Sequence, residues 1–326
     1  MRIVSGAEVT QALPMRRAID VMRKALVSLE RGEALQPPRT MMKLPGGQDA
    51  AWIMPGFAGE PASFGVKVLT VVPGNAGTPH HTHQGAVLLF GHRGELLAIL
   101  DAAALTAIRT AAVSAVATQA LAREDSALLA ILGSGAQAMS HVDGMMEVRP
   151  ITNVRVWSRT PANAERFAAE VTERFPVEVL AAPTVRDAVR DADIVCTTTG
   201  ARDPIVEGGW LRPGAHVNAI GSASATDREL DGAAVQRARV FVDRMEAAMR
   251  EAGDLLLAID EGAVAADAFA GELGAVLVGR IEGRRSADEI TLFKSVGLSA
   301  EDVAGAREVY EECLRRGLGH EVAFGS

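Results

Sequence analysis

The sequence predicts an α/β protein built from two lobes, one with a mostly antiparallel sheet and one with a parallel, nucleotide-binding sheet. Three observations lead to this prediction. A chain of 326 residues exceeds what one hydrophobic core usually serves. Its opening third holds short apolar segments separated by Pro-Gly and Gly-Gly turns. Its middle alternates apolar runs with stretches of helix length, around a glycine-rich turn.

Composition and charge exclude several classes of protein. The chain is 48% hydrophobic with a net charge of −8, which argues against disorder and against nucleic acid as a partner. No uninterrupted apolar run of membrane-spanning length occurs, and the N-terminus lacks the pattern of a secretory signal. The two cysteines, Cys196 and Cys313, lie far apart, which fits a reducing compartment. We therefore expect a soluble, cytoplasmic protein with no membrane partner.

The first lobe begins with a helix that we expect Thr10 to cap and that runs to about Glu30, before Gly32. Its apolar positions share one helical face, and they are Ile19, Met22, Leu26 and Leu29. Strands are then expected at residues 39–43, 51–54, 65–72, 86–90 and 96–100. The Ala-rich stretch 101–123 is expected to be helical.

The second lobe is predicted to contain parallel strands, because its apolar runs alternate with amphipathic stretches. These strands are expected at 127–132, 154–157, 177–180, 194–197, 216–220 and 240–242. The tail from Ser299 is helical in pattern and is expected to return to the first lobe.

A glycine-rich turn, GSGAQA at 133–138, follows the first of these strands and precedes a helix. Gly133 would permit the tight turn, and Gly135 would let a pyrophosphate approach the backbone. Ala136 and Gln137 would begin the helix whose N-terminus favours the phosphates, and Ala138 would replace the third glycine. The pattern alone is weak evidence, but its strand-turn-helix context indicates a dinucleotide site.

The end of the second strand bears on which dinucleotide binds. Sites for NAD usually present an acidic residue here, whereas this chain has Ser158, Arg159 and Thr160. A guanidinium flanked by hydroxyls suits a 2′-phosphate. We therefore expect NADPH, with NADH less favoured; the alternative is a simple exposed arginine at a strand end.

Five separated motifs then identify a family. They are RTAAVSA (109–115), GSGAQA (133–138), SRT (158–160), VNAIGS (217–222) and TLFKSVGLSAED (291–302). In this order, over nearly the whole chain, they resemble the ornithine cyclodeaminase/mu-crystallin family. The resemblance implies a homodimer with a substrate-binding and dimerisation domain of α+β type at 1–115 and 299–326. A Rossmann NADP-binding domain at 116–298 would be inserted in it.

Three basic residues lie in apolar or small-residue surroundings outside the nucleotide lobe: Arg39, Lys67 and Arg109. A buried cation must be paired or must await an anion, so we expect the three, if they converge, to bind a carboxylate ligand. The resemblance implies this convergence, with Lys67 and Arg109 as catalytic residues and Lys67 close enough to exchange a proton with the reacting nitrogen. The alternative for Lys67 is a structural salt bridge, and a purely structural role is also open for Arg39, whose sequence context is less distinctive.

The resemblance also assigns residues around the nicotinamide and substrate. It places Thr82 beside the nicotinamide, and it makes Val296 and Gly297 close over the nicotinamide and substrate. The ends of the fourth and fifth strands lie where cofactors bind in such sheets, which adds Thr199, Ala219, Ile220, Gly221 and Ser222. The sequence Pro79-His80-His81-Thr82-His83 looks like a metal site but has no carboxylate or cysteine at ligand spacing. We expect no metal there.

Two positions depart from the cyclodeaminase pattern. Ala223 stands where cyclodeaminases carry an acid/base Asp, and Met54 stands where they tend to place a Glu. Alanine transfers no proton, so cyclodeamination should be feeble unless Asp227 takes over. The pattern is closer to that of the ketimine reductases of the family.

The expected reaction is therefore NADPH-dependent reduction of a small cyclic imine carboxylate. Candidates are Δ1-pyrroline-2-carboxylate and Δ1-piperideine-2-carboxylate, each bound as an iminium that accepts a hydride. Two other functions remain open: a cyclodeaminase or alanine dehydrogenase type of enzyme, and a non-catalytic NADPH-binding protein. The sequence leaves ring size and direction of flux undetermined.

Overall fold

Two compact units make up the chain in the computed structural model, which describes residues 1–45, 49–59, 61–75, 78 and 82–324. Unit 1 comprises Met1–Arg109 and Leu298–Ser326, and unit 2 comprises Thr110–Gly297. The divisions at 109/110 and 297/298 compare with the predicted boundaries at 115/116 and 298/299. The first division falls inside a single helix, α3 (Ala102–Leu121), where no loop marks it.

Unit 1 is built on a seven-stranded sheet in the order β15-β1-β6-β5-β4-β3-β2. The strands are β1 (Arg2–Val4), β2 (Thr40–Lys43), β3 (Ala50–Ala58), β4 (Ser63–Val71), β5 (His83–Phe90), β6 (Leu96–Asp101) and β15 (His320–Glu321). All neighbours are antiparallel except β1 and β6. This confirms the predicted antiparallel sheet, although the short strands β1 and β15 carried no sequence signal.

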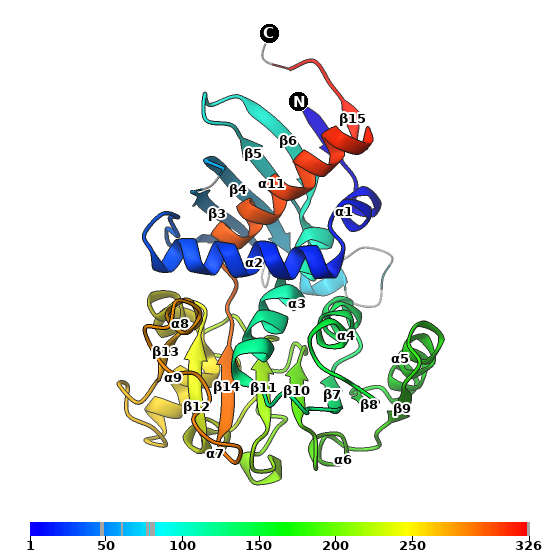
Figure 1. Cartoon of the computed structure of the whole chain (residues 1–326), viewed down its shortest axis with the longest axis vertical. Helices are drawn as coiled ribbons and strands as arrows, with labels where there is room; N and C mark the ends of the chain where they lie inside the picture. The colour runs from blue at the N-terminus through cyan, green and yellow to red at the C-terminus, as the bar shows by residue number, and fades with distance from the viewer. Residues whose placement is uncertain (46–48, 60, 76–77, 79–81, 325–326) are drawn as a thin grey trace. The chain divides into compact units, whose positions relative to one another are not determined.

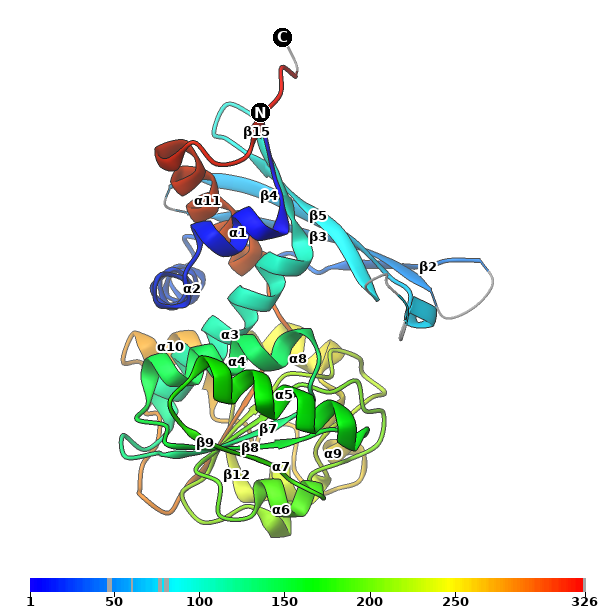
Figure 2. The same cartoon turned by 90° about the vertical axis from the view of Figure 1, so that its right-hand side faces the viewer.

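Helices cover one face of this sheet, as Figure 2 shows. They are α1 (Gly6–Ala12), α2 (Met15–Glu30) and α11 (Ser299–Arg316). Helix α11 contacts β3, β4 and β5, so the prediction that the tail returns to the first lobe is confirmed. The predicted single helix from Thr10 to Glu30 is wrong. Pro14 ends α1 and precedes α2, and Ser5 rather than Thr10 provides the cap.

Unit 2 contains an eight-stranded parallel sheet in the order β13-β12-β14-β11-β10-β7-β8-β9. The strands are β7 (Leu128–Leu132), β8 (Asn153–Trp157), β9 (Glu178–Ala181), β10 (Ile194–Thr197), β11 (His216–Ala219), β12 (Ala238–Val242), β13 (Gly271–Glu272) and β14 (Ile290–Lys294). The six predicted strands are all present. The order reverses between β7 and β10, which is where such sheets bind ligands at their carboxyl ends.

Helices lie on both faces of the parallel sheet (Figure 1, Figure 2). They are α4 (Ala136–Val148), α5 (Pro161–Arg174), α6 (Val185–Val189), α7 (Gly232–Arg237), α8 (Met245–Glu251), α9 (Gly253–Asp260) and α10 (Leu273–Leu277). Helix α3 is long and apolar enough to cross a membrane by those criteria alone, yet 72% of its apolar window is buried inside the protein. Such burial is typical of a core helix.

Candidate functional site

The two glycines of the turn after β7, Gly133 and Gly135, have different roles that the sequence could not distinguish. Gly133 has φ +112°, and a Cβ there would lie 2.8 Å from Thr198 Oγ1, so the fold itself requires glycine. Gly135 has a negative φ, and among the described residues nothing lies within 4 Å of where its Cβ would be. Neither conformation nor packing explains this second glycine. The space beside it is what a close-lying pyrophosphate needs.

The first turn of α4 supports the same interpretation. Ala136 begins the helix, and Gln137 places its side-chain Oε1 in a buried position where no described residue hydrogen-bonds to it. A buried carbonyl oxygen without a partner costs free energy unless a ligand or water pairs with it. Because a Cβ added at Gly133 would lie 2.8 Å from Thr198 Oγ1, the loops after β7 and β10 lie side by side, at the switch point of the sheet. The residues present therefore fit a bound dinucleotide.

The three residues that follow β8, namely Ser158, Arg159 and Thr160, are polar, and we call them the strand-end group. Ser158 accepts a hydrogen bond from Ser134 Oγ at 3.0 Å. Arg159 and Thr160 are exposed, and within the described chain neither side chain makes a hydrogen bond or ion pair. Thr160 precedes α5 without using its hydroxyl to cap it. In the described structure, the guanidinium of Arg159 and the hydroxyl of Thr160 therefore make no bond that would stabilise the fold.

The ends of β10 and β11 contribute mainly backbone. Thr199 donates both its N–H and its hydroxyl to Glu229, and Gly221 donates its N–H to the same carboxylate. Ala219 is fully buried as the last residue of β11, so its side chain belongs to the core. Ile220 follows it and is half-buried. Ser222 is buried, and its hydroxyl donates to Asp227 O at 2.5 Å, which commits this side chain to its own loop.

The segment after β14 is held by another carboxylate. Asp243 Oδ2 accepts hydrogen bonds from Val296 N at 2.8 Å, Gly297 N at 2.9 Å and Ser295 Oγ at 2.9 Å. Gly297 has φ +77°, a conformation that favours glycine. Val296 and Gly297 therefore have a fixed backbone, with their N–H groups already bonded within unit 2.

In unit 1, Lys67 and Arg109 meet around one carboxylate. Lys67 Nζ lies 3.2 Å from both oxygens of Asp302, and Arg109 Nε donates to Asp302 Oδ1 at 2.9 Å. Arg109 Nη1 also donates to Glu301 Oε2 at 3.2 Å. All four side chains are at most 5% exposed. Carboxylates of α11 thus pair both buried cations, which is the structural alternative that the sequence left open for Lys67. Binding of a substrate carboxylate by Lys67 and Arg109 stays a prediction.

Close packing of α11 on the sheet brings Asp302 to Lys67. A Cβ at Gly56 of β3 would lie 2.8 Å from the Ser299 carbonyl carbon, and one at Gly65 of β4 would lie 2.7 Å from Val303. Only glycine at these two positions lets the helix approach so closely. The start of α11 is held further by Gln36, whose Oε1 accepts from Ala300 N at 3.0 Å.

The charge state of Lys67 follows from this burial. Burial lowers the pKa of Lys67 to about 8, against the opposing effect of Asp302, and Arg109 and Arg39 lower it further. Burial alone would raise the pKa of Asp302, but Arg109 and Lys67 bring it below its ordinary value. Lys67 therefore holds a proton at neutral pH but loses it at a lower pH than a free lysine does, because its pKa is about 8 and not 10.5.

Arg39 lies at the edge of this group and differs from the other two cations. It is half-buried, and its guanidinium carbon lies 5.4 Å from the centre of the Trp52 ring. It still acts electrostatically on Lys67, so the three cations do gather in unit 1. We name Arg39, Lys67, Arg109, Glu301 and Asp302 the charged cluster.

Thr82 stands just before β5, where its hydroxyl lies 3.1 Å from His83 Nδ1. Burial and the positive charge of Lys67 lower the pKa of His83. The residues Pro79, His80 and His81 of the histidine-rich turn lie outside the described residues. Within the described ranges, no cluster of metal-ligating side chains occurs.

Comparison with known proteins identifies the chain. The model of the ornithine cyclodeaminase/mu-crystallin family matches residues 2–317. The chain belongs to this family. A Δ1-pyrroline-2-carboxylate reductase of Bacillus cereus is 37% identical over 99% of this chain and 100% of its own length. The ketimine reductase mu-crystallin of Mus musculus is 39% identical over 86% of both chains.

A solved structure extends the likeness to three dimensions. Δ1-Pyrroline-2-carboxylate reductase of Thermococcus litoralis, in complex with NADH and L-proline, has a TM-score of 0.96 and 33% identity over 99% of this chain and 100% of that one. The predicted family, the Rossmann fold class and the enzyme class, an oxidoreductase acting on imines, are confirmed. A nicotinamide dinucleotide is supported as the cofactor, without a preference for NADPH.

The two departures from the cyclodeaminase members of the family have clear structural places. Met54 of β3 is the direct cross-strand partner of Lys67 on β4, and it is buried. Ala223 is half-buried in the loop after β11. Asp227 accepts from Thr226 Oγ1 at 3.3 Å, and its carbonyl is bonded to Ser222. An apolar side chain therefore flanks the lysine where cyclodeaminases tend to place a carboxylate.

Several functional candidates of this family member escaped sequence analysis. Glu301 and Asp302 end the motif 291–302, but nothing local showed that they face Lys67 and Arg109, more than 190 positions away. Glu229 and Asp243 likewise bond across loops. A buried cation demands a counter-charge, and that general rule was the one available signal.

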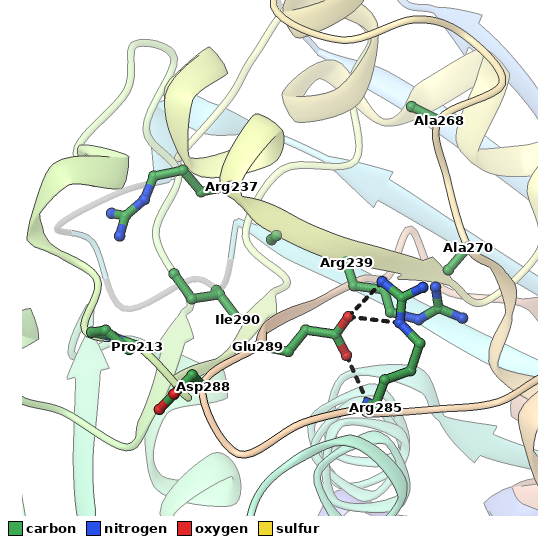
Figure 3. A pocket seen from close by; sticks show the side chains of 10 residues that line it. Pro213, Arg237, Arg239, Ala268, Ala270, Arg285, Asp288, Glu289 and Ile290 are labelled. Carbon is green, nitrogen blue, oxygen red and sulfur yellow. Dashed lines mark hydrogen bonds and ion pairs between the residues drawn. The ribbon is translucent and has the colours of Figure 1, made fainter.

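A hollow of about 470 Å³ in unit 2 lies elsewhere (Figure 3). It is lined by Ala238 and Ile290, the first residues of β12 and β14, and so lies at the amino ends of the strands. Arg285 and Glu289, four positions apart in the chain, also line it and pair with each other at 2.8 Å. Ligands bind at the carboxyl ends in sheets of this kind, so this hollow is not the nucleotide site.

Proposed function

We propose that this protein reduces a small cyclic imine carboxylate, Δ1-pyrroline-2-carboxylate or Δ1-piperideine-2-carboxylate, to the cyclic amino acid with NADPH. One observation carries the proposal: buried Lys67 shares the carboxylate of Asp302 with Arg109 and lies opposite apolar Met54 on the neighbouring strand. The imine, one proton and one hydride give the amine, so the protein needs a proton donor and no carboxylate base. The bound dinucleotide supplies the hydride.

Lys67 and Arg109 have complementary tasks in this proposal. Arg109 and Arg39 bind the substrate carboxylate, and Lys67 keeps the imine nitrogen protonated. Asp302 holds both Lys67 and Arg109 by direct bonds, which fixes their orientation before the substrate arrives. Its lowered pKa makes it a counter-charge and not a proton donor.

The strand-end group favours NADPH over NADH. Arg159 and Thr160 are exposed and, in the described structure, are bonded to no other side chain, so they are available to a 2′-phosphate. Gly133, Gly135, Ala136 and Gln137 would hold the pyrophosphate. This preference is a proposal, because the solved relative with 33% identity contains NADH.

We further propose a homodimer through the uncovered face of the unit 1 sheet. Helices cover one face, and by the strand register the other face carries exposed large apolar side chains, namely Met42, Ile53, Phe64 and Val68. Ile53 and Val68 are direct cross-strand partners. Val68→Lys should give monomers in size-exclusion chromatography with light scattering; a dimer of unchanged affinity would refute this interface.

The deciding experiment offers each imine to the purified protein with NADPH and with NADH, and follows cofactor oxidation. We expect turnover of at least one imine and a higher kcat/KM with NADPH. Ammonia release from ornithine, or turnover of alanine, would instead favour the cyclodeaminase or alanine dehydrogenase alternative. Dinucleotide binding without oxidation by either imine would leave the non-catalytic alternative.

A further inference from the structure

A buried carboxylate ties together two strand ends at the carboxyl edge of the unit 2 sheet. Glu229, which is fully buried, accepts hydrogen bonds from Thr197 Oγ1 at 2.6 Å, Thr199 N at 2.7 Å, Thr199 Oγ1 at 2.6 Å and Gly221 N at 2.8 Å. Thr197 ends β10 and Thr199 lies two residues beyond it, while Gly221 follows β11, the parallel neighbour of β10. One side chain thus bridges the two segments.

The donors decide the charge of Glu229. Each carboxylate oxygen of Glu229 has two hydrogen-bond partners, and two of the four, Thr199 N and Gly221 N, can only donate. Burial raises the pKa of Glu229, while Lys294 and the two threonine hydroxyls oppose the rise. The two backbone N–H donors and the nearby charge of Lys294 favour the ionised form, and charge-assisted bonds are the strong ones.

The Glu229 backbone is itself anchored. Asp254, also fully buried, accepts from Glu229 N at 2.7 Å and Leu230 N at 2.9 Å, and its other oxygen lies 2.7 Å from Lys294 Nζ. Lys294 ends β14 and donates to Ser222 O at 2.5 Å. The loop at 221–222 is therefore held from two sides, by Glu229 through Gly221 and by Lys294 through Ser222.

The fit at Gly221 shows how close the bridge is. A Cβ there would clash with the Thr199 carbonyl oxygen and would lie 2.5 Å from Glu229 Oε1. The ends of β10 and β11 approach each other this closely because residue 221 is glycine. The Glu229 carboxylate also accepts the hydrogen bonds of the inward-facing N–H groups of Thr199 and Gly221. Without the carboxylate, four buried donors would lose their acceptor.

We propose that Glu229 is a positioning residue for the dinucleotide, fixing Thr199 and the 219–222 segment at the spacing the cofactor requires. The inference rests on the proposed dinucleotide site, since those residues are the ones proposed to contact it. Glu229 itself is fully buried and acts through the residues it holds. Loss of the bridge should weaken cofactor binding more than a comparable loss elsewhere in the same sheet.

Strand β10, whose carboxyl end is bonded to Glu229, offers a matched control at its amino end. Asp193 precedes β10 and also accepts four hydrogen bonds, from Ala127 N, Leu128 N, Arg123 and Arg212. It is 6% exposed and lies at the amino edge, away from the proposed cofactor. Glu229→Gln and Asp193→Asn each replace a carboxylate oxygen by an amide nitrogen that cannot accept these bonds.

The test measures the dissociation constant of NADPH by fluorescence titration, and the melting temperature without cofactor, for both variants. Both should melt lower than the parent protein. The Kd should rise by about tenfold or more for Glu229→Gln, as expected for two lost charge-assisted bonds, and stay within about twofold for Asp193→Asn. Equal Kd changes in the two variants, or none for Glu229→Gln, would overturn the inference.

A milder pair keeps the test decisive if Glu229→Gln does not fold. Thr199→Val removes one hydroxyl donor, and Thr199→Ser retains it. We expect a Kd increase of roughly three- to tenfold for the valine variant, as for one lost hydrogen bond, with recovery in the serine variant. Equal Kd values for these two variants would contradict the inference. A parent protein that binds no dinucleotide would instead contradict the proposed function.

Discussion

The charged cluster of unit 1 and the glycine turn of unit 2 are proposed to bind two reactants by opposite means. In the cluster, Lys67, Arg109, Glu301 and Asp302 are at most 5% exposed and form ion pairs with one another, while Arg39 is half-buried at its edge. The turn offers backbone and open space, and the end of the neighbouring strand β8 adds Arg159, which is exposed and makes no ion pair in the described structure. One site depends on desolvated charge, the other on shape and open space.

This difference explains which substitutions should matter most. Removing a buried charge alters the pKa of its neighbours and leaves a partner uncompensated, so its effects are large and depend on pH. Altering an exposed residue or a glycine changes affinity for one ligand and leaves the remaining interactions in place. Four predictions test this contrast, in order of decreasing effect.

The largest effect is expected for Lys67→Met, which keeps the length of the side chain but removes the proton donor. The kcat/KM for the imine should fall by about 10²–10⁴-fold, the usual contribution of a positioned acid. Dinucleotide affinity, measured by fluorescence, should stay unchanged. Lys24→Met, at an exposed position of α2, is the matched control. A loss below about threefold would contradict the proposed role of Lys67.

Arg159→Ala should lower the preference for NADPH over NADH by roughly 10–100-fold, because charge-assisted bonds to a phosphate contribute about 1.5–3 kcal/mol. The ratio of kcat/KM values for the two cofactors measures it. Arg186→Ala, another exposed arginine of unit 2, should leave the ratio unchanged. An equal fall in kcat/KM with both cofactors would show that Arg159 does not contact the 2′-phosphate.

The pH profile should sharpen the contrast further. The pKa of Lys67 is lowered to about 8, so the protonated, active form predominates below pH 8, and activity should fall about tenfold per pH unit above it. Asp302→Asn removes the charge that raises this pKa, so the alkaline limb should move to lower pH. Asp20→Asn, exposed on α2, should not move it. An unchanged limb in Asp302→Asn would assign the ionisation to another group.

The smallest effect concerns the two glycines of the turn. Gly133→Ala forces a positive φ on a residue with a Cβ and should destabilise the protein by about 1–3 kcal/mol. Gly135→Ala should leave the melting temperature within about 1 °C while weakening dinucleotide binding. Thermal unfolding without cofactor separates the two. Equal destabilisation by both substitutions would show that Gly135 has a structural task.

The comparison also explains what could be predicted at each site. GSGAQA lies within six consecutive residues, so local spacing was enough to place a turn between β7 and α4. Lys67 and Asp302 are 235 positions apart, and only the packing of α11 on Gly56 and Gly65 brings them together. Pro14 shows a local error, because the helical pattern continued across a residue that interrupts the helix.

From the sequence alone came the parallel and antiparallel halves, the glycine turn, the polar end of β8 and the family, because apolar periodicity and short motifs are local properties of the chain. The tertiary structure alone decided that the buried cations are paired, that Met54 flanks Lys67, and that Glu229 bridges β10 and β11. Buried charges and polar groups must find partners, and which partner each one finds depends on how distant segments pack.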